Sequence, residues 1–314
     1  MPSSTVPVMG TLATVQVVGD GVSLQDAAER SRAIEHALAW FHRIEQCCTR
    51  FDPASEVMQL AAHAGVAVPV SAMLFEAVRL ALAVAEASGG AFDPTVGRRM
   101  ELRGFDREHR TGAVIRTQIA ADEPVSYRDV SLDPGRKTIT LRRPLILDLG
   151  AVAKGLAIDM AARELIAYSG FAIDAGGDLY LGGRNPEGDP WRVGIRHPRE
   201  DHELIDAVHV TNRAVCTSGD YERRSPGAGG GHHIIDPRSG DSPASVASVT
   251  VIAQTAVLAD ALATAAFVLG PVDGIRLLER HGVEGLIVTP TLERHATQGM
   301  DSEVNRLTTC RTDS

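Results

Sequence analysis

The chain has 314 residues, a formal net charge of −9 at pH 7, and 44% hydrophobic and 23% charged residues. This composition is typical of a folded globular protein whose core fills one large domain or two. The negative charge argues against nucleic acid or an anionic membrane as the main partner. The N-terminal segment lacks the basic and apolar regions of a signal peptide, no run of eighteen apolar residues occurs, and the four cysteines lack metal-ligand spacing. We therefore expect a cytoplasmic protein with reduced thiols and no membrane span.

In the first half of the chain, hydrophobic periodicity predicts one strand and two helices, at residues 11–18, 24–47 and 73–87. Residues 92–97 are predicted to form a loop, because proline and glycine punctuate them. Residues 107–131 are polar and weakly patterned, so they could hold short edge strands or be an insertion.

The second half is predicted to begin with a strand at the apolar run 145–147, followed by a helix and another strand that ends near Gly182. The remaining predicted elements are antiparallel strands at 191–195 and 205–210, a strand at 249–252, an apolar helix at 257–269 and a late strand at 286–288. A polar tail follows from His295, and neither an internal repeat nor a long linker divides the chain.

The segment from Asp148 to Gly155 is the strongest functional signal. It turns through Gly150 from the apolar run into the predicted helix. Unpaired N–H groups and the helix dipole make such a helix start attractive to a phosphate group. Lys154 adds a positive charge there, and it is one of two lysines in a chain rich in arginine. A lysine in this position indicates a task that needs a compact ammonium group.

Asp260 and Thr264 are four residues apart on the predicted helix 257–269, so their oxygen-bearing side chains share one face. A charged Asp on an otherwise apolar helix needs a partner. A hard cation such as magnesium is one solution, and a helix cap or a hydrogen-bonded pair is another.

Three further segments carry polar groups next to glycine. His232 and His233 precede a short apolar stretch that is predicted to be a strand, where neighbouring side chains point to opposite faces, so at most one histidine faces a site. Residues 216–221 could contact phosphate through Ser, Thr and backbone groups, or could be an ordinary turn. Residues 174–178 allow close approach of a ligand to their glycines. Neither a dinucleotide-binding glycine motif nor a Walker motif is present.

Taken in order, these segments resemble the ApbE family, the FAD:protein FMN transferases. The matching segments are Met9–Thr11, Phe51–Glu56, Gly90–Gly97, Asp148–Gly155, Ala175–Asp178, Thr217–Tyr221, His233–Gly240 and Ala259–Ala265. Each is weak alone, but their occurrence in the same order over most of the chain is specific.

The resemblance implies an α+β fold with a T-fold-like portion, in which helices pack on mixed or antiparallel sheets. It implies one transferase domain over residues 1–300, which could consist of two intertwined subdomains, and a separate tail at 301–314. It also implies a magnesium ion held by the backbone carbonyl of Ala151 and the side chains of Asp260 and Thr264. FAD is then expected near the following residues: Met9, Phe51, Ala91, Phe92, Asp93, Asp148, Lys154 and Ile235.

The reaction that the resemblance implies is transfer of FMN from FAD to a Thr or Ser hydroxyl of an acceptor flavoprotein, with release of AMP. We expect magnesium and Lys154 to neutralise the diphosphate. His233 is the first candidate for the base, since the ordinary histidine pKa suits neutral pH, and Asp178 and Asp220 are alternatives.

Three other functions are compatible with the sequence. One is a magnesium-dependent FAD pyrophosphatase that gives FMN and AMP, the second is a flavin-binding protein without activity, and the third is a generic α+β domain. Two departures from the family pattern stand out: the chain lacks an exported lipoprotein signal and its Cys, and residues 98–106 are more charged than is usual there. The charged segment leaves open the shape of that part of the pocket.

Overall fold

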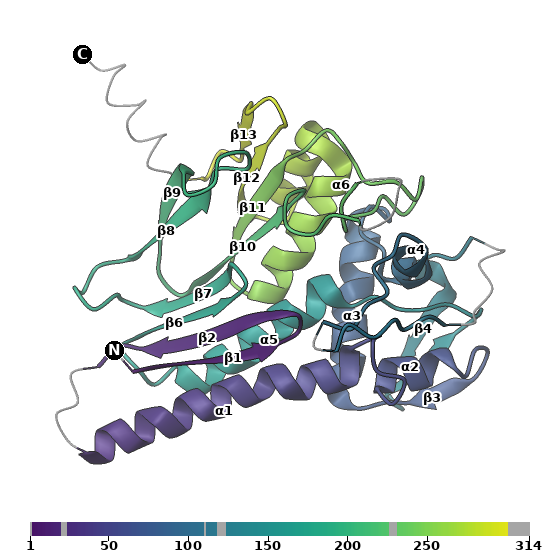
Figure 1. Ribbon diagram of the computed structural model, residues 1–314, viewed down its shortest axis with the longest axis horizontal. Helices are drawn as coiled ribbons and strands as arrows, with labels where there is room; N and C mark the ends of the chain where they lie inside the picture. Colours follow the sequence, from purple (N-terminus) through teal and green to yellow (C-terminus); the bar gives the residue numbers. More distant parts are fainter. Residues whose placement is uncertain (1, 20–23, 110, 118–123, 226–230, 301–314) are drawn as a thin grey trace.

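A large antiparallel sheet forms the centre of the molecule (Figure 1). The computed structural model describes residues 2–19, 24–109, 111–117, 124–225 and 231–300. The order of the eight strands is β1-β2-β6-β7-β10-β11-β12-β13, and every neighbouring pair is antiparallel. Their bounds are β1 Ser3–Val8, β2 Thr11–Val17, β6 Gly170–Ala175, β7 Asp178–Gly183, β10 Arg213–Gly219, β11 Ser248–Ala253, β12 Glu284–Val288 and β13 Arg294–Ala296.

Three long helices, α1 (Leu24–Cys48), α5 (Gly150–Leu165) and α6 (Ala256–Arg280), pack on one face of this sheet, and α5 packs against both α1 and α6. A fourth helix, α3 (Ala72–Ala87), packs against all three. Beside α3 lies a small subassembly made of short elements: α2 Glu56–Ala61, η1 Pro94–Val96, α4 Gly97–Leu102, η2 Tyr127–Asp129, and the sheet of β3 Ala67–Pro69, β5 Thr138–Leu141 and β4 Val130–Asp133.

The opposite face of the large sheet is covered by a two-stranded ribbon, β8 (Trp191–Arg196) and β9 (Leu204–Val210). Val193, Ile195 and Val208 from this ribbon are buried against apolar side chains of the sheet, so a second and smaller core lies there. The molecule therefore has three layers, of helices, sheet and ribbon. This confirms the expected α+β class with helices on antiparallel sheets.

Gly155 allows α5 and α6 to approach backbone to backbone. A Cβ atom at this position would lie 2.5 Å from the Cα of Val257 and 2.6 Å from the carbonyl oxygen of Ala256. No side chain fits there without moving one of the helices. This close approach sets the position of the first turns of α6 relative to α5.

Asp159 caps the start of α6 from the neighbouring helix. Its carboxylate accepts hydrogen bonds from the N–H groups of Ala256 (2.7 Å) and Val257 (3.0 Å), while Thr255 at the N-cap position makes no side-chain bond. The cap thus comes from α5, which ties the two helices together.

The stability of the protein should depend on pH through Asp159. Burial raises the pKa of this carboxyl to about 6, against two backbone N–H bonds that lower it. An acid with a raised pKa binds its proton more tightly when folded, so its contribution to the free energy of unfolding falls as pH rises from about 4 to about 6. We expect Asp159→Asn to flatten this part of the curve, measured by urea unfolding at several pH values. An unchanged slope would contradict this role.

Most of the long elements match the sequence-based predictions within a residue or two, but the apolar run 145–147 does not form a strand. Leu145, Ile146 and Leu147 are fully buried in an extended segment outside the sheets. The stretch after His233 is likewise irregular, and the weakly patterned region 107–131 holds η2 and the start of β4. The predicted tail, residues 301–314, lies outside the described residues.

The apolar helix expected at 257–269 is the first part of α6. Gly270 has φ 83° and Pro271 follows, so the helix kinks there before it continues to Arg280. By length and composition α6 is the one described helix that could cross a membrane, but most of that stretch is buried in the protein, as in the core helices of many folds.

Candidate active site

The start of α5 is held by an ion pair rather than left open. Asp148 accepts hydrogen bonds from the Nε of Arg50 (2.7 Å) and from the N–H of Gly150 (2.9 Å). Burial alone would raise the pKa of Asp148, but Arg50 and the Gly150 N–H outweigh burial, and the pKa is lowered. Asp148 is therefore ionised at neutral pH, and it orients both Arg50 and the first turn of α5.

Lys154 lies between two carboxylates. Its Nζ pairs with Asp178 at the start of β7, and lies 3.1 Å from Oδ2 of Asp260 on α6. The side chains of Asp178 and Asp260 are only 4% and 8% exposed, whereas that of Lys154 is 22% exposed. The sequence predicted that the charged Asp260 needs a partner. In this structure that partner is the ammonium group of Lys154.

The second oxygen-bearing residue of α6 faces the same region. Thr264 Oγ1 lies 3.3 Å from Ser218 Oγ at the end of β10, and the N–H of Thr217 donates to Asp178 (3.0 Å). Two carboxylates therefore flank Lys154 of α5, and two hydroxyls meet one turn further along α6, in the region where α5, with Ala151 in its first turn, packs on α6. Oxygen ligands of this kind suit a hard cation such as magnesium, so the residues present fit the ion that the sequence implied.

The tip of the β1-β2 hairpin and the end of α1 meet in a second part of the region. Met9 has a positive φ of 53°, and its N–H donates to Glu45 (2.7 Å). The ring of Phe51 packs edge-on against His109, 6.0 Å between centroids. A Cβ on Gly10 would lie 2.5 Å from the His109 ring, so the hairpin tip touches that ring. His109 was missed because nothing in the polar region 107–131 marks it.

Four of the residues expected to contact FAD are buried in the protein. Ala91, Phe92 and Ile235 are 2%, 5% and 6% exposed. Asp93 caps η1, because its carboxylate accepts hydrogen bonds from the N–H and hydroxyl of Thr95 (2.9 and 2.7 Å), and it also accepts one from the N–H of Tyr127 (2.9 Å). Because these side chains are buried, a ligand would contact the backbone of these four residues rather than their side chains.

The two histidines occupy different environments, although the segment is not the strand on which the prediction of opposite faces depended. The Nε2 of His232 lies 2.9 Å from the carbonyl of Pro243, and its ring packs edge-on against Phe267. The pKa of His233 is lowered to about 4, mainly by burial, and the nearby charges of Arg223 and His232 act in the same direction. The expectation of an ordinary pKa at His233 is therefore wrong, because the ring is desolvated near a cation. Its Nδ1 is buried and has no hydrogen-bond partner among the described residues.

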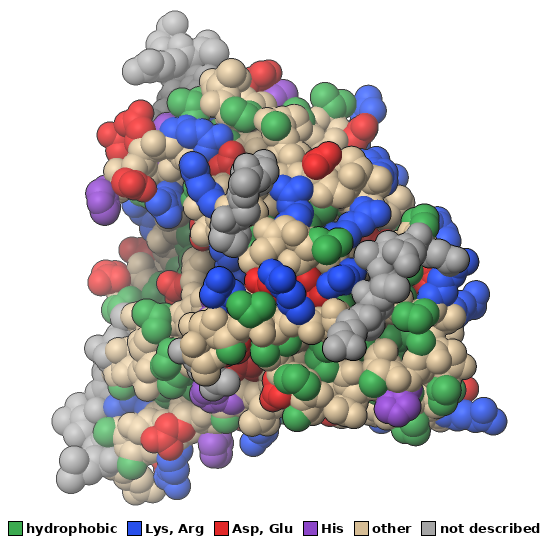
Figure 2. Space-filling view, turned by 45° about the vertical axis from the view of Figure 1, so that its right-hand side comes forward, with side chains coloured by type: hydrophobic (Ala, Val, Ile, Leu, Met, Phe, Trp, Pro, Cys, Tyr) green, Lys and Arg blue, Asp and Glu red, His purple; other side chains and the backbone are tan. Residues whose placement is uncertain are grey.

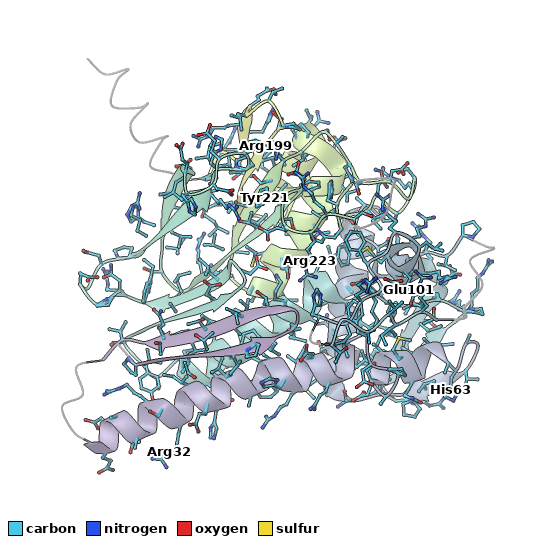
Figure 3. The ribbon with its side chains drawn as sticks, in the orientation of Figure 1. Arg32, His63, Glu101, Arg199, Tyr221 and Arg223 are labelled. Carbon is cyan, nitrogen blue, oxygen red and sulfur yellow. The ribbon has the colours of Figure 1, made fainter. Side chains whose placement is uncertain are left out.

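Arg223 is a further cation that the sequence did not single out. Its carbonyl accepts from the N–H of His233 (3.0 Å), and its exposed side chain lies near the centre of the molecule in Figure 3. Burial is the larger cause of the lowered pKa of both His233 and His109, and the positive charge of Arg223 is the second cause for each. Arg223 thus links the His233 segment to the Phe51 region.

Both alternative bases are engaged in ion pairs. Asp220 forms a two-pronged pair with Arg199 (2.8 Å for each contact), and Asp178 pairs with Lys154. Arg199 comes from the loop between β8 and β9 and lies beside Tyr221 in Figure 3. Each of these carboxylates is thus already paired with a cation, whereas the Nδ1 of His233 has no hydrogen-bond partner among the described residues.

The unusually charged segment 98–106 has a structural role. Arg99 donates to the carbonyl of Pro237, and Arg103 donates to the carbonyl of Gly240 and the hydroxyl of Ser242 (3.0 Å each). These arginines hold the turn that follows His233.

Figure 2 shows basic side chains gathered over the middle of the face that it presents. Although the protein has a net negative charge, it therefore has a local surface suited to anions.

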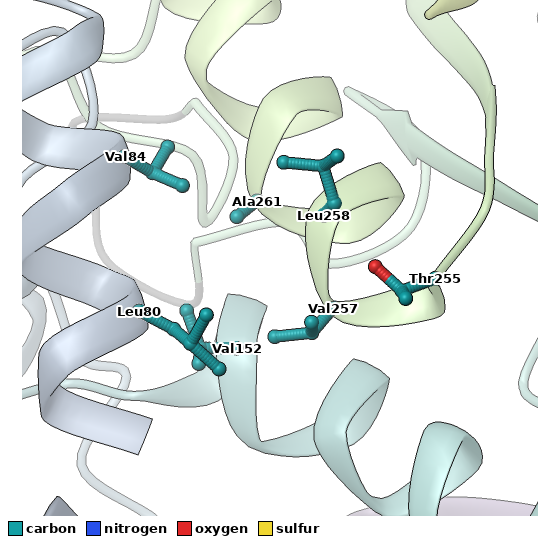
Figure 4. A pocket seen from close by; sticks show the side chains of 7 residues that line it. All are labelled: Leu80, Val84, Val152, Thr255, Val257, Leu258 and Ala261. Atoms are coloured by element: carbon teal, nitrogen blue, oxygen red, sulfur yellow. The ribbon is translucent and has the colours of Figure 1, made fainter. Parts of the chain in front are cut away.

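The described residues also line an apolar hollow between α3, α5 and α6, of about 190 Å³ (Figure 4). Its lining is Leu80, Val84, Val152, Thr255, Val257, Leu258 and Ala261. It lacks charged groups, so it is distinct from the polar region around Lys154.

Comparison with known proteins identifies the family. The model of the ApbE family matches residues 9–287. The chain belongs to the ApbE family. A FAD:protein FMN transferase of Treponema pallidum is 35% identical over 96% of this chain and 88% of its own length, and one from Escherichia coli K12 is 31% identical over 70% and 66%.

Solved structures of ApbE proteins share the fold. The ApbE protein of Thermotoga maritima is 30% identical, covers 98% of both chains and has a TM-score of 0.83. The apo flavinyl transferase ApbE of Pseudomonas stutzeri is 28% identical over 95% of this chain and 94% of its own, with a TM-score of 0.77. The expected family, fold class and enzymatic nature of this ApbE chain are thereby confirmed.

Proposed function

We propose that this ApbE-family enzyme transfers FMN from FAD to a Thr or Ser hydroxyl of an acceptor flavoprotein, with magnesium required. The hydroxyl oxygen attacks the phosphorus on the FMN side of the diphosphate. A phosphoester forms, the bond to the AMP phosphate breaks, and AMP leaves. The acceptor gains FMN, and the proton of its hydroxyl passes to a base on the enzyme.

The observation that carries the proposal is the convergence on Lys154 of segments far apart in the chain. Asp178 of β7 and Asp260 of α6 pair with its ammonium group, and Thr264, one turn after Asp260 on α6, contacts Ser218 of β10. A reaction that develops charge on a diphosphate needs cations held in fixed positions. This grouping, together with relatives named as transferases, supports transfer over simple flavin binding.

Each group has a stated task in the proposal. Asp260, Thr264 and the carbonyl of Ala151 would hold magnesium, which when bound supplies charge neutralisation at the phosphate oxygens. Lys154 and the N-terminal turn of α5 bind the diphosphate. Arg50 is fixed by Asp148. The rest of FAD is surrounded by Met9, Phe51, Ala91, Phe92, Asp93 and Ile235. His233 accepts the hydroxyl proton.

Mass spectrometry tests the proposal directly. A candidate acceptor flavoprotein is incubated with the enzyme, FAD and magnesium, and its mass is followed. A gain that matches FMN on a Thr or Ser residue is expected, and it should disappear when EDTA removes the metal. Free FMN without modified acceptor would indicate a pyrophosphatase. Intact FAD that stays bound would indicate a flavin-binding protein.

The base is tested with His233→Ala. We expect turnover to fall about 10²-fold or more, while FAD affinity changes little. Because the pKa of His233 is lowered to about 4 in the free enzyme, its neutral form persists well below pH 6.5, so kcat/KM should stay high down to about pH 5. His36→Ala, on the exposed face of α1, is the matched control. Equal losses in turnover and FAD affinity would make His233 a binding group.

The partners proposed are FAD and the acceptor flavoprotein alone. The net charge of −9 gives neither nucleic acid nor an anionic membrane a complementary surface over the whole molecule. Action in the cytoplasm remains a prediction.

A further inference from the structure

Lys154 lies between the carboxylate of Asp178 and that of the candidate metal ligand Asp260. Its ammonium contacts Asp178 and lies 3.1 Å from Asp260. Asp260 is the charged member of the candidate magnesium ligands. The cation found beside it in the structure is therefore part of the chain itself.

The local charges explain why an ammonium is held there. Two carboxylates, each less than a tenth exposed, would repel each other and lose hydration if no cation lay between them. With Lys154 the group carries one net negative charge. A divalent ion at Asp260 must either displace the ammonium or share the carboxylate with it, and two cations at one oxygen repel.

We propose that Lys154 is an internal counter-cation that competes with the divalent metal for Asp260, and that the FAD diphosphate relieves this competition. The inference rests on the metal site of the proposed function. In the flavin-free enzyme the ammonium keeps the two carboxylates in place and weakens metal binding. When FAD binds, its diphosphate offers Lys154 another anionic partner, and Asp260 is released to the metal. Metal and FAD then bind with positive coupling.

Asp178 acts here as a positioning residue. One of its oxygens accepts the N–H of Thr217 (3.0 Å), which fixes the carboxylate at the start of β7, and the other pairs with Lys154. Anchored in this way, Asp178 keeps the ammonium within reach of Asp260 in the flavin-free enzyme.

Binding of Mn²⁺ to the flavin-free protein, followed by the EPR signal of the free ion, tests the competition. We expect Lys154→Met to bind Mn²⁺ on the order of tenfold more tightly than the parent, because Asp260 loses its competitor. The same variant should bind FAD more weakly without metal, because the diphosphate loses a cation. Opposite shifts of the two constants are expected, and weaker or unchanged Mn²⁺ binding would overturn the proposal.

A double variant separates direct competition from general electrostatics. Lys154→Met combined with Asp178→Asn removes one positive and one negative charge, so the local net charge equals that of the parent. It also avoids leaving Asp178 as an unpaired buried carboxylate, which could unfold the single variant. Tighter Mn²⁺ binding by the folded double variant supports competition by the ammonium. Affinity equal to that of the parent would mean that Lys154 acts through its charge alone, and the proposal would fail.

The coupling is measured by repeating the Mn²⁺ titrations with saturating FAD, with chromatography to check that the FAD is intact. The gain in Mn²⁺ affinity caused by FAD should be several-fold larger in the parent than in the double variant. Equal gains would overturn the release by the diphosphate. The flavin-free arm needs neither acceptor nor turnover, so a failure of FMN transfer and a failure of this competition are distinguishable.

Discussion

Asp260→Ala should lower the rate of FMN transfer by about 10³-fold or more while the protein remains folded. Asp260 is 6% exposed on α6, and its carboxylate is the charged ligand proposed for magnesium. Its removal leaves Thr264 and a backbone carbonyl, which hold a divalent ion weakly. The fold should survive, because Lys154 keeps its ion pair with Asp178 and the rest of this part of α6 is apolar and buried.

The assay is the mass gain of the acceptor, with circular dichroism and thermal unfolding to confirm the fold. Asp273→Ala is the matched control, since Asp273 lies on the same helix but its side chain is 63% exposed and pairs with Arg276 in the next turn. We expect that control to keep full activity. Full activity in Asp260→Ala would exclude Asp260 as a metal ligand, and restoration of an inactive variant by millimolar magnesium would indicate weakened metal binding rather than lost chemistry.

Gly155→Ala should destabilise the fold by about 1–3 kcal/mol, although alanine usually favours a helix over glycine by about 1 kcal/mol. The added Cβ would lie 2.5 Å from Val257 Cα and 2.6 Å from the Ala256 carbonyl, and both contacts are with backbone that cannot rotate away. The helices must separate. Separation would weaken the Asp159 cap on α6 and move Asp260 away from Lys154, so transfer activity should fall together with stability.

Urea unfolding gives the change in free energy, and Arg163→Ala on the exposed face of α5 serves as the control, with an expected change within about 0.5 kcal/mol. For Gly155→Ala the sign of the change in the free energy of unfolding decides the prediction. A variant that is more stable than the parent would mean that the helix pair has room for a side chain at this position.

The sequence by itself determined the long elements of the fold. Helices α1, α3 and the first part of α6, and strands such as β2 and β11, carry hydrophobic periodicities that depend only on neighbouring residues. The order of the motifs determined the family in the same way. It also indicated that the helix start after Asp148 and the face with Asp260 and Thr264 carry function, since a lysine or a carboxylate there departs from its surroundings.

Only the tertiary structure decided which groups pair. The apolar run 145–147 is buried without joining a sheet, because apolar composition reports burial and leaves hydrogen-bond partners open. Lys154 pairs with Asp178 and Asp260, which are 24 and 106 residues away in the chain, and burial beside Arg223 lowers the pKa of His233 to about 4. Charge pairing and desolvation depend on distances between segments remote in sequence, and local patterns carry no information about those distances.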